Sequence, residues 1–511
     1  MRDLASASPD VARDTRSEPG PSAPLTALAT TPAQVLALQR SIGNAAVGQM
    51  LARHKKDKKP AEDDVDAGTP DLVPRDERHP KAVELLQMKL NWHLGAQGQP
   101  LLSQDGSYGG KTLRALQAFQ KAAGIVPNNG AVKSDTWAAL AQPPGARTKD
   151  MTGPDGKPAV SPDYDAMLED GLLEVTIAEG FDENEGLYLE EVREMKMGLT
   201  LVRGFSPAAG EEEEIFKNAG RPVPTGGLLY LKKNIGTSKG RPVHCVVNLI
   251  VPAGEKTHGT TGGAETKAAA LRGMKQSDAF IYDGHGRYGT GPDFDRNWWI
   301  TVDWERYFEQ FKRRPKDPKG KLRAGTVEYT DSREIHDVEV NLNLTSPAVF
   351  DKLEKASVIT FHAAGQGNIG INAMPNDKSL HAYLQGRSRS DKGDEELRDE
   401  FKDSTEREYR LWLFNGCNTH NYEKKIRSSG DNLSTKKLDM FATQNTIQGT
   451  TTAEALLSYL DGLISRESAY ALEGRMEEAQ VAEKAPYGAY GFEDNANGYV
   501  KPPAPAKRKG R

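Results

Sequence analysis

The sequence is poor in cysteine and has no long apolar run. Cys245 and Cys417 are the two cysteines among 511 residues. Two thiols cannot build a disulfide framework, which favours a protein that folds in a reducing compartment. No uninterrupted apolar stretch reaches the roughly 18 residues of a membrane-spanning helix, so we expect no membrane span. The formal net charge of -5 is small for this length and gives no reason to expect nucleic acid as a partner.

Several chemical signatures are also missing. The 10 histidines are scattered and form no HExxH or paired Cys-x-x-Cys arrangement. No GxxxxGK[ST] loop for nucleotide phosphates is present. We therefore expect no metal and no cofactor. The N-terminus, MRDLASASPDVARDTRSEPGPSAP, lacks the apolar core of a secretory signal. We expect synthesis in the cytoplasm and, if the protein is exported or injected, a route that does not use the general secretory pathway.

Composition divides the chain into compact and loose parts. The 50 Gly and 30 Pro residues, with 37% hydrophobic residues, are typical of globular parts separated by flexible ones. We predict a disordered N-terminus over residues 1–60 with short helices at 31–53, a linker over 143–165 and a disordered tail over 483–511. Compact domains are expected over residues 78–142 and 166–482.

The short helices at 31–53 begin at Thr31-Pro32, an N-cap followed by a first-turn proline. The stretch LQRSIGNAAVGQMLAR within them resembles the N-terminal motif of proteins associated with extracellular contractile injection systems. The resemblance implies docking onto such a particle as cargo or effector. The alternative is an amphipathic helix that docks onto another partner.

Residues 78–142 show three apolar helical faces separated by glycine-containing turns. The faces comprise Val83, Leu85, Leu86, Met88 and Leu90, then Leu113, Leu116 and Phe119, then Trp137 and Leu140. The segment DGSYGGKTLRALQAFQKAAGI and the later Thr136-Trp137 resemble the small three-helix peptidoglycan-binding domain. This resemblance implies binding of the cell wall without chemistry. The alternative is a helical spacer in which Tyr108 and Trp137 belong only to the core.

Residues 166–482 alternate between apolar strands and helices, which predicts an α/β fold with a doubly wound, mostly parallel sheet. We expect the segment 166–240 to be an accessory layer or a pro-segment. Near-continuous apolar runs indicate strands that are buried on both faces, as in a parallel sheet. The expected strands are 172–177, 243–251, 279–282, 357–361, 411–414 and 440–447.

Two of these strands deliver chemically useful side chains at their carboxyl ends. Ala279–Tyr282 leads into Asp-Gly-His285-Gly, and Leu411–Phe414 leads into Asn-Gly-Cys417. In an open α/β sheet this edge is where ligands bind. A histidine that takes the thiol proton leaves a thiolate, the nucleophile of a cysteine enzyme. Cys245 lies in the most apolar strand, where we expect it to be part of the core.

A strand ending in His-Gly, followed by a parallel strand ending in a small residue and Cys, is similar to the caspase–gingipain clan of cysteine peptidases. The resemblance implies that His285 is the general base, that Cys417 is the nucleophile, and that the backbone N–H groups of Gly286 and Cys417 hold the oxyanion. The sequence departs from the caspase pattern, because 132 residues separate the two instead of roughly 50.

A second histidine, His362, also follows an expected strand and is the alternative base; otherwise it is a substrate-side or structural residue. Asp283, Asp293 and Asp295 surround His285 in the sequence and favour a basic residue on the amino side of the scissile bond (P1). The alternative for Asp293 and Asp295 is a solvated loop.

Together these features predict a bacterial cysteine endopeptidase that uses a Cys-His dyad on a protein or peptide substrate and is targeted to the cell wall by residues 78–142. Two alternatives stay open. One is a wall-associated cargo or adaptor protein without catalysis, and the other is a peptidase that acts on peptidoglycan cross-links.

Overall fold

The structure is a computed structural model that describes residues 70–75, 78–144, 160–181, 185–252, 261–286, 291–295, 298–317, 320–329, 338, 342–344, 346–363, 367–371, 380–387, 396–402, 409–445, 452–479 and 487–492. The chain divides into two compact units, Met1–Val65 and Asp66–Arg511, and every described residue belongs to the second. The short helices predicted at 31–53, and the disorder predicted over 1–60, lie outside the described residues. None of the helices in the described part is long and apolar enough to cross a membrane.

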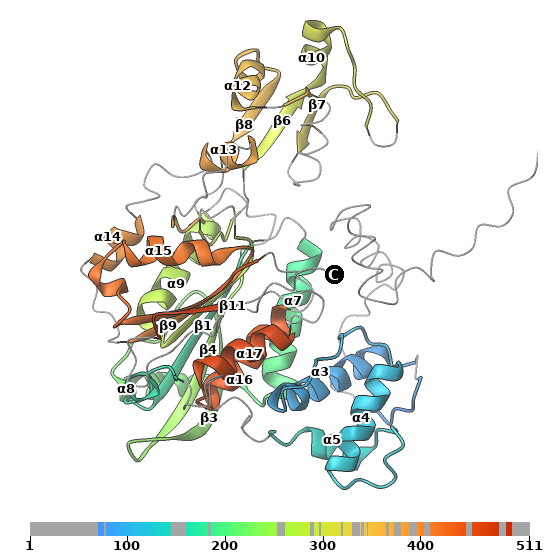
Figure 1. Ribbon diagram of the computed structural model, residues 1–511, viewed down its shortest axis with the longest axis vertical. Helices are drawn as coiled ribbons and strands as arrows, with labels where there is room; N and C mark the ends of the chain where they lie inside the picture. Colours follow the sequence, from blue (N-terminus) through green and yellow to red (C-terminus); the bar gives the residue numbers. More distant parts are fainter. Residues whose placement is uncertain are drawn as a thin grey trace, which may run out of the picture. The chain divides into compact units, whose positions relative to one another are not determined.

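The largest element is an eight-stranded sheet in the order β11-β10-β9-β5-β1-β4-β3-β2 (Figure 1). Its inner strands β4, β1, β5, β9 and β10 run parallel, and the pairs at both edges are antiparallel. The fold is therefore a mixed α/β fold with a mostly parallel sheet, as predicted. The strands are β1 Leu172–Glu179, β2 Ser206–Pro207, β3 Leu228–Ser238, β4 Arg241–Ile250, β5 Ala279–Asp283, β9 Arg410–Asn415, β10 Leu438–Thr443 and β11 Tyr487–Tyr490.

The five parallel strands follow one of the common doubly wound orders. Numbered along the chain, their spatial order is second, first, third, fourth, fifth. In such a sheet the order reverses between the first and third strands, here β1 and β5. Ligands bind in the crevice outside the carboxyl ends of the strands at this reversal.

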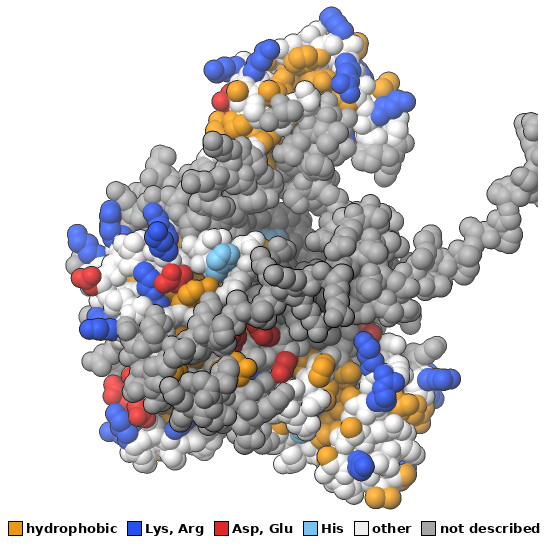
Figure 2. Space-filling view, in the orientation of Figure 1, with side chains coloured by type: hydrophobic (Ala, Val, Ile, Leu, Met, Phe, Trp, Pro, Cys, Tyr) orange, Lys and Arg blue, Asp and Glu red, His pale blue; other side chains and the backbone are white. Residues whose placement is uncertain are grey.

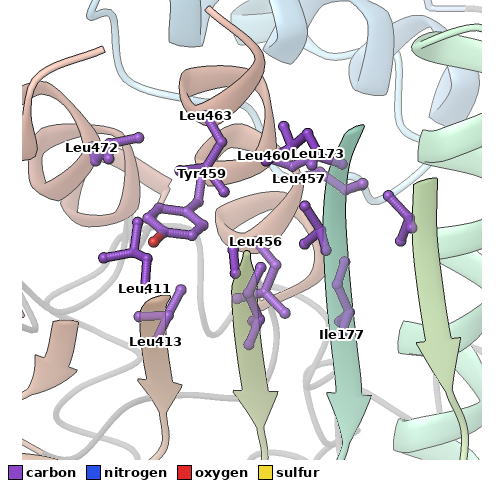
Figure 3. Close-up of a cluster of buried hydrophobic side chains, with 14 of the residues drawn as sticks. Leu173, Ile177, Leu411, Leu413, Leu456, Leu457, Tyr459, Leu460, Leu463 and Leu472 are labelled. Atoms are coloured by element: carbon purple, nitrogen blue, oxygen red, sulfur yellow. The ribbon is translucent and has the colours of Figure 1, made fainter. Parts of the chain in front are cut away.

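Helices cover both faces of the sheet, and strands β1, β5, β9 and β10 are buried along their whole length. One face is covered by α7 Glu185–Met197, π-helix η2 Gly198–Val202, α16 Thr452–Ile464 and α17 Ala469–Ala479. The other is covered by α9 Thr261–Gln276, α14 Glu396–Lys402 and α15 Tyr422–Arg427. Figure 3 shows leucines of α16 packed against β1 and β9. Each fully buried leucine contributes about 1.5–3 kcal/mol.

The segment 166–240 is an integral part of this sheet, which corrects its interpretation as an accessory layer or pro-segment. It supplies β1, β2 and β3, with α8 Glu211–Ala219, and β1 lies between β5 and β4. Every residue of β1 is buried, so the strand needs partners on both sides. The start of the domain also precedes 166, because Val160 and α6 Tyr164–Met167 contribute to the core.

The C-terminal boundary needs a correction too. Residues 487–492 were expected in a disordered tail, but β11 pairs antiparallel with β10 and closes one edge of the sheet. Phe492 and Tyr487 are buried against the α16 and α17 face. The rest of the expected tail, residues 493–511, lies outside the described residues.

A second, three-stranded antiparallel sheet has the order β7-β6-β8, with β6 Trp299–Asp303, β7 Thr326–Tyr329 and β8 Ile359–His362. It packs with α10 Trp304–Phe311, α12 Pro347–Lys355 and α13 Leu380–Arg387. The expectation that 357–361 joins the parallel sheet was therefore wrong. The alternation Ile-Thr-Phe-His exposes one side of β8, whereas a central parallel strand is buried on both. The surface of this second sheet and its helices carries Lys and Arg side chains beside exposed hydrophobic side chains (Figure 2).

Residues 70–144 form the predicted three-helix domain, with α3 Pro80–Ala96, α4 Gly110–Ala122 and α5 Ser134–Leu140. The indole Nε1 of Trp137 donates to the Pro70 carbonyl at 3.1 Å, so Trp137 belongs to the core of this domain. Helix α3 also packs against the α/β domain, where Lys89 Nζ donates to the Leu201 carbonyl at 2.7 Å. Residues 145–159 of the expected linker lie outside the described residues.

Candidate active site

His285 and Cys417 reach the same edge of the central sheet because their strands are direct neighbours. Strands β5 and β9 pair in parallel, and every pair from Ala279↔Leu411 to Asp283↔Asn415 joins a residue to the one 132 positions later. Cys417 also lies 132 positions after His285. Each stands two residues beyond the last residue of its strand. The register therefore aligns the two residues at the carboxyl edge, where parallel sheets bind ligands.

The backbone contact continues beyond the strands. The Gly284 N–H donates to the Asn415 carbonyl at 3.0 Å, which carries the pairing one residue past β5. A Cβ atom on Gly286 would come within 2.1 Å of the Cys417 carbonyl oxygen, and one on Gly416 within 2.6 Å of the Gly284 carbonyl oxygen. No side chain fits at either position, so glycine is required for this approach.

Cys417 is only partly buried and begins a tight change of direction. Asn418 has φ 56°, in the left-handed region, and its N–H donates to the Asn445 carbonyl at 3.0 Å. The 3₁₀ helix η5 Thr419–Asn421 and then α15 follow, and the 3₁₀ helix η6 Asp431–Leu433 leads on to β10. The turn places the cysteine at the end of a buried strand with its side chain partly accessible, the exposure that a nucleophile needs.

A row of buried polar residues lies directly below this edge. Glu179, Asp283 and Asn415 are the last residues of β1, β5 and β9, and they pair across the three strands. Asn415 Nδ2 donates to Asp283 Oδ1 at 2.9 Å, and the Tyr487 hydroxyl donates to Asn415 Oδ1 at 2.6 Å. The first two members of the row end the strands on either side of the order reversal.

Burial and the Asp283 carboxylate disfavour the ionisation of Glu179. The exposed fractions of Glu179 and Asp283 are 2% and 3%, so neither carboxylate is well hydrated. Burial raises the pKa of Glu179 well above its ordinary value, and the neighbouring Asp283 carboxylate raises it further. A cation entering this space would relieve both effects, because it favours the charged forms of both groups.

Glu191 of α7 brings a third carboxylate to the same place. One oxygen from each of Glu179, Glu191 and Asp283 lies within 4.8 Å of the others, an arrangement that could hold a metal ion. Oxygen ligands of this kind suit Ca²⁺ or Mg²⁺. The same three carboxylates also suit an organic cation. The absence of a metal, expected from the sequence, stays a prediction.

The other predicted acidic residues are buried, so the solvated-loop alternative for them was wrong. The Asp293 N–H donates to the Tyr282 hydroxyl at 3.2 Å, and the Asp295 N–H to Asp293 Oδ1 at 3.3 Å. A Cβ atom on Gly263 would meet Asp295 Oδ2 at 2.3 Å. Asp295 therefore packs against the first turn of α9, where the positive end of the helix favours a carboxylate.

The remaining histidines near the site in sequence have other partners. His362 ends β8, which belongs to the second sheet; its ring stacks on Trp299 at 4.9 Å, and its Nε2 lies 3.0 Å from Thr301 Oγ1. His420 Nδ1 lies 3.2 Å from the Thr443 carbonyl. Neither strand register nor backbone pairing aligns these residues with Cys417 as it does His285.

Cys245 is fully buried in β4, and burial raises the pKa of its thiol. This is the environment expected of a core cysteine.

Sequence reasoning missed Glu179 and Asn415. The available signal was a polar residue at the end of each expected strand, since Ile177-Ala178 leads into Glu179 and Leu411 to Phe414 into Asn415. Reading that signal required knowing that β1 adjoins β5, which the pattern of one strand does not reveal.

Comparison with known proteins identifies one part of the chain. Residues 79–140 match the family model described as a putative peptidoglycan binding domain. The match spans α3, α4 and α5 and indicates association with the cell wall. No curated protein and no solved structure matches the chain.

Proposed function

We propose that the protein is a cysteine endopeptidase in which Cys417 is the nucleophile and His285 the general base. The observation that carries the proposal is the shared register of β5 and β9, which aligns the two residues at one sheet edge. The close approach of their backbones, which glycine at 286 and 416 permits, supports it because it brings the two strand ends together. The order of the histidine strand and the cysteine strand is the one that the resemblance to the caspase–gingipain clan implies.

In this mechanism the His285 imidazole takes the proton from Cys417 Sγ, and the thiolate attacks the scissile carbonyl carbon. The carbonyl oxygen becomes an oxyanion that accepts hydrogen bonds from the N–H groups of Gly286 and Cys417. When the C–N bond breaks, the imidazolium gives its proton to the leaving amine. Water then hydrolyses the thioester, with His285 as base, and regenerates the thiol.

The acidic pair at the strand ends supports a preference for a basic P1 side chain. Glu179 and Asp283 are buried and end the two strands at which the strand order reverses. Asp283 precedes His285 by two residues, and Glu179 pairs with Asp283. A lysine or arginine side chain that reaches them gains two charge-assisted partners in a place with little water. The P1 assignment thus keeps Asp283 and adds Glu179, while the packing of Asp295 against α9 supports a structural role for that residue.

The cell-wall domain gives the enzyme a location. Residues 79–140 would hold it at peptidoglycan, where surface proteins or wall peptides are the accessible substrates. Carriage by a contractile injection particle through residues 31–53 is a further proposal that rests on the sequence motif alone.

The test compares the full-length protein with Cys417→Ala and His285→Ala on reporter peptides that carry Arg, Lys or Asp at P1. We expect cleavage after Arg and Lys, loss of cleavage in both variants, and retention in the matched control Cys245→Ala, which removes the buried thiol. Equal turnover by the unmodified protein and Cys417→Ala would remove Cys417 as the nucleophile, and no cleavage by the unmodified protein would leave a wall-associated adaptor without catalysis.

A second candidate is hydrolysis of peptidoglycan cross-links, which the wall-domain match favours. Incubation with purified sacculi, followed by muramidase digestion, separates the two, because a cross-link peptidase converts cross-linked muropeptides into monomers and a protein-directed peptidase does not. The Cys417→Ala protein is the control for both.

A further inference from the structure

Buried hydroxyl groups donate hydrogen bonds to backbone carbonyls at or next to His285 and Cys417. We propose that Tyr282 and Thr443 are positioning residues that fix the two N–H groups of the oxyanion site before substrate binds. The inference deepens the proposed peptidase function and rests on it. Both side chains are fully buried, Tyr282 in β5 and Thr443 at the end of β10.

Thr443 acts on the peptide unit that joins Gly416 to Cys417. Its hydroxyl donates to the Gly416 carbonyl oxygen. Because a trans peptide is planar, the carbonyl of one residue and the N–H of the next point in opposite directions. Fixing the Gly416 carbonyl toward β10 therefore turns the Cys417 N–H away from β10, toward the side of the sheet edge where β5 lies.

Tyr282 acts in the same way on the peptide unit that joins His285 to Gly286. Its hydroxyl donates to the His285 carbonyl at 3.0 Å and accepts the Asp293 N–H at 3.2 Å. The first bond directs the His285 carbonyl toward the buried tyrosine, so the Gly286 N–H points away from it. The second bond also holds the hydroxyl in place, because its oxygen accepts from Asp293 while its proton is donated to His285.

The two peptide units lie against each other. A Cβ atom on Gly416 would be 3.3 Å from the Gly286 nitrogen, and one on Gly286 would be 3.3 Å from the Cys417 nitrogen. The Tyr422 hydroxyl donates to the Gly286 carbonyl at 2.8 Å and fixes the following peptide unit as well. The hydroxyls of Thr443, Tyr282 and Tyr422 thus fix the carbonyls of Gly416, His285 and Gly286, which surround the oxyanion site.

Preset donors matter because an oxyanion site works by needing no rearrangement when charge develops. Loss of one donor in an oxyanion site lowers kcat by about 10²–10³-fold. Loss of an anchor leaves the donor present but free to turn, so we expect kcat to fall about tenfold to a hundredfold, with KM changed less than threefold. The hydrogen bonds of the anchors go to backbone carbonyls next to the N–H groups, so their effect is exerted through the backbone.

The experiment measures kcat and KM on an arginine reporter for Thr443→Val and Tyr282→Phe in the full chain. Each preparation is normalised by native iodoacetamide titration of Cys417, which requires no oxyanion site and discounts misfolded protein. Thr443→Ser restores the hydroxyl and should recover kcat. The matched controls are Thr176→Val, which removes a buried hydroxyl bonded to Ser277 at 2.7 Å, and Tyr459→Phe, which removes another buried tyrosine hydroxyl.

Reduced kcat in Thr443→Val and Tyr282→Phe, recovery in Thr443→Ser and unchanged controls would support the inference. It is overturned if kcat per titrated thiol stays within twofold of the unmodified value, or if Thr443→Ser is as impaired as Thr443→Val. Should Thr443→Val not fold, Tyr282→Phe and its control decide. An unmodified protein that cleaves no reporter overturns the peptidase proposal, and this inference with it.

Discussion

Replacing Glu179 with glutamine tests the assignment of the acidic pair to the P1 pocket. The substitution keeps the size of the side chain and removes its charge. The oxygens of Glu179 and Asp283 lie within 4.8 Å of each other, so a cation between them is at comparable range from both. At an effective dielectric constant of about 20, one such charge pair is worth about 3.5 kcal/mol.

Part of that energy is offset by removing water from the cation and by ionising Glu179, whose pKa burial and Asp283 raise, so we expect a loss of about 1–2 kcal/mol. At about 1.4 kcal/mol for each factor of ten, kcat/KM for an arginine reporter should fall roughly 5- to 30-fold. A reporter with norleucine at P1 carries no charge and should change less than threefold. The ratio of the two values isolates the charge from any general damage to the site.

The assay is initial-rate cleavage of the two reporters, identical apart from P1, by the unmodified protein and by Glu179→Gln. Glu191→Gln is the matched control, because Glu191 belongs to the same cluster but is less buried, and its effect should be smaller. An equal loss on both reporters, or no loss on arginine, would refute the assignment.

Three other predictions concern pH, packing and metal. Burial raises the pKa of Glu454 to about 7, despite its ion pair with Arg203, so the folded state holds this proton more tightly than the unfolded state. This stabilisation, on the order of 3 kcal/mol, is present below about pH 4.5 and lost as pH rises to 7; urea denaturation across that range should show a slope that Glu454→Gln reduces. Tyr459→Phe removes a buried hydroxyl that, within the described residues, has no hydrogen-bond partner, so the midpoint should stay or rise by the equivalent of about 1 kcal/mol; a clear fall would show that the hydroxyl is paired. Treatment with EDTA should leave kcat/KM unchanged, and a loss restored by Ca²⁺ would assign the carboxylates to a metal.

The sequence was most informative where a strand ended. Leu411 to Phe414 is continuously apolar, which requires burial on both faces, so the position of Cys417 at a sheet edge followed from physics. The same reasoning placed His285 after Tyr282. The resemblance implied that the two strands are parallel, and their direct pairing in the structure is what aligns the residues.

The pairing of strands that are far apart in the chain could not be predicted from the sequence. Nothing local to Leu172 to Ile177 says that this strand lies between β4 and β5, so the segment 166–240 was taken for an accessory part and Glu179 was missed. Residues 357–361 were assigned to the wrong sheet, although the alternation of Ile359, Thr360 and Phe361 was a legible sign of a strand exposed on one side. Hydroxyl anchors such as Thr443 are equally invisible, because they depend on three-dimensional contacts.

The most direct test of the dyad is the rate at which iodoacetamide alkylates Cys417 at pH 7, followed by peptide mapping. If His285 draws the proton from the thiol, His285→Ala should slow alkylation at least tenfold. His420→Ala, which removes a histidine nearer in sequence, should leave the rate unchanged. Equal rates in the unmodified protein and His285→Ala would contradict the account, as would slowing confined to His420→Ala.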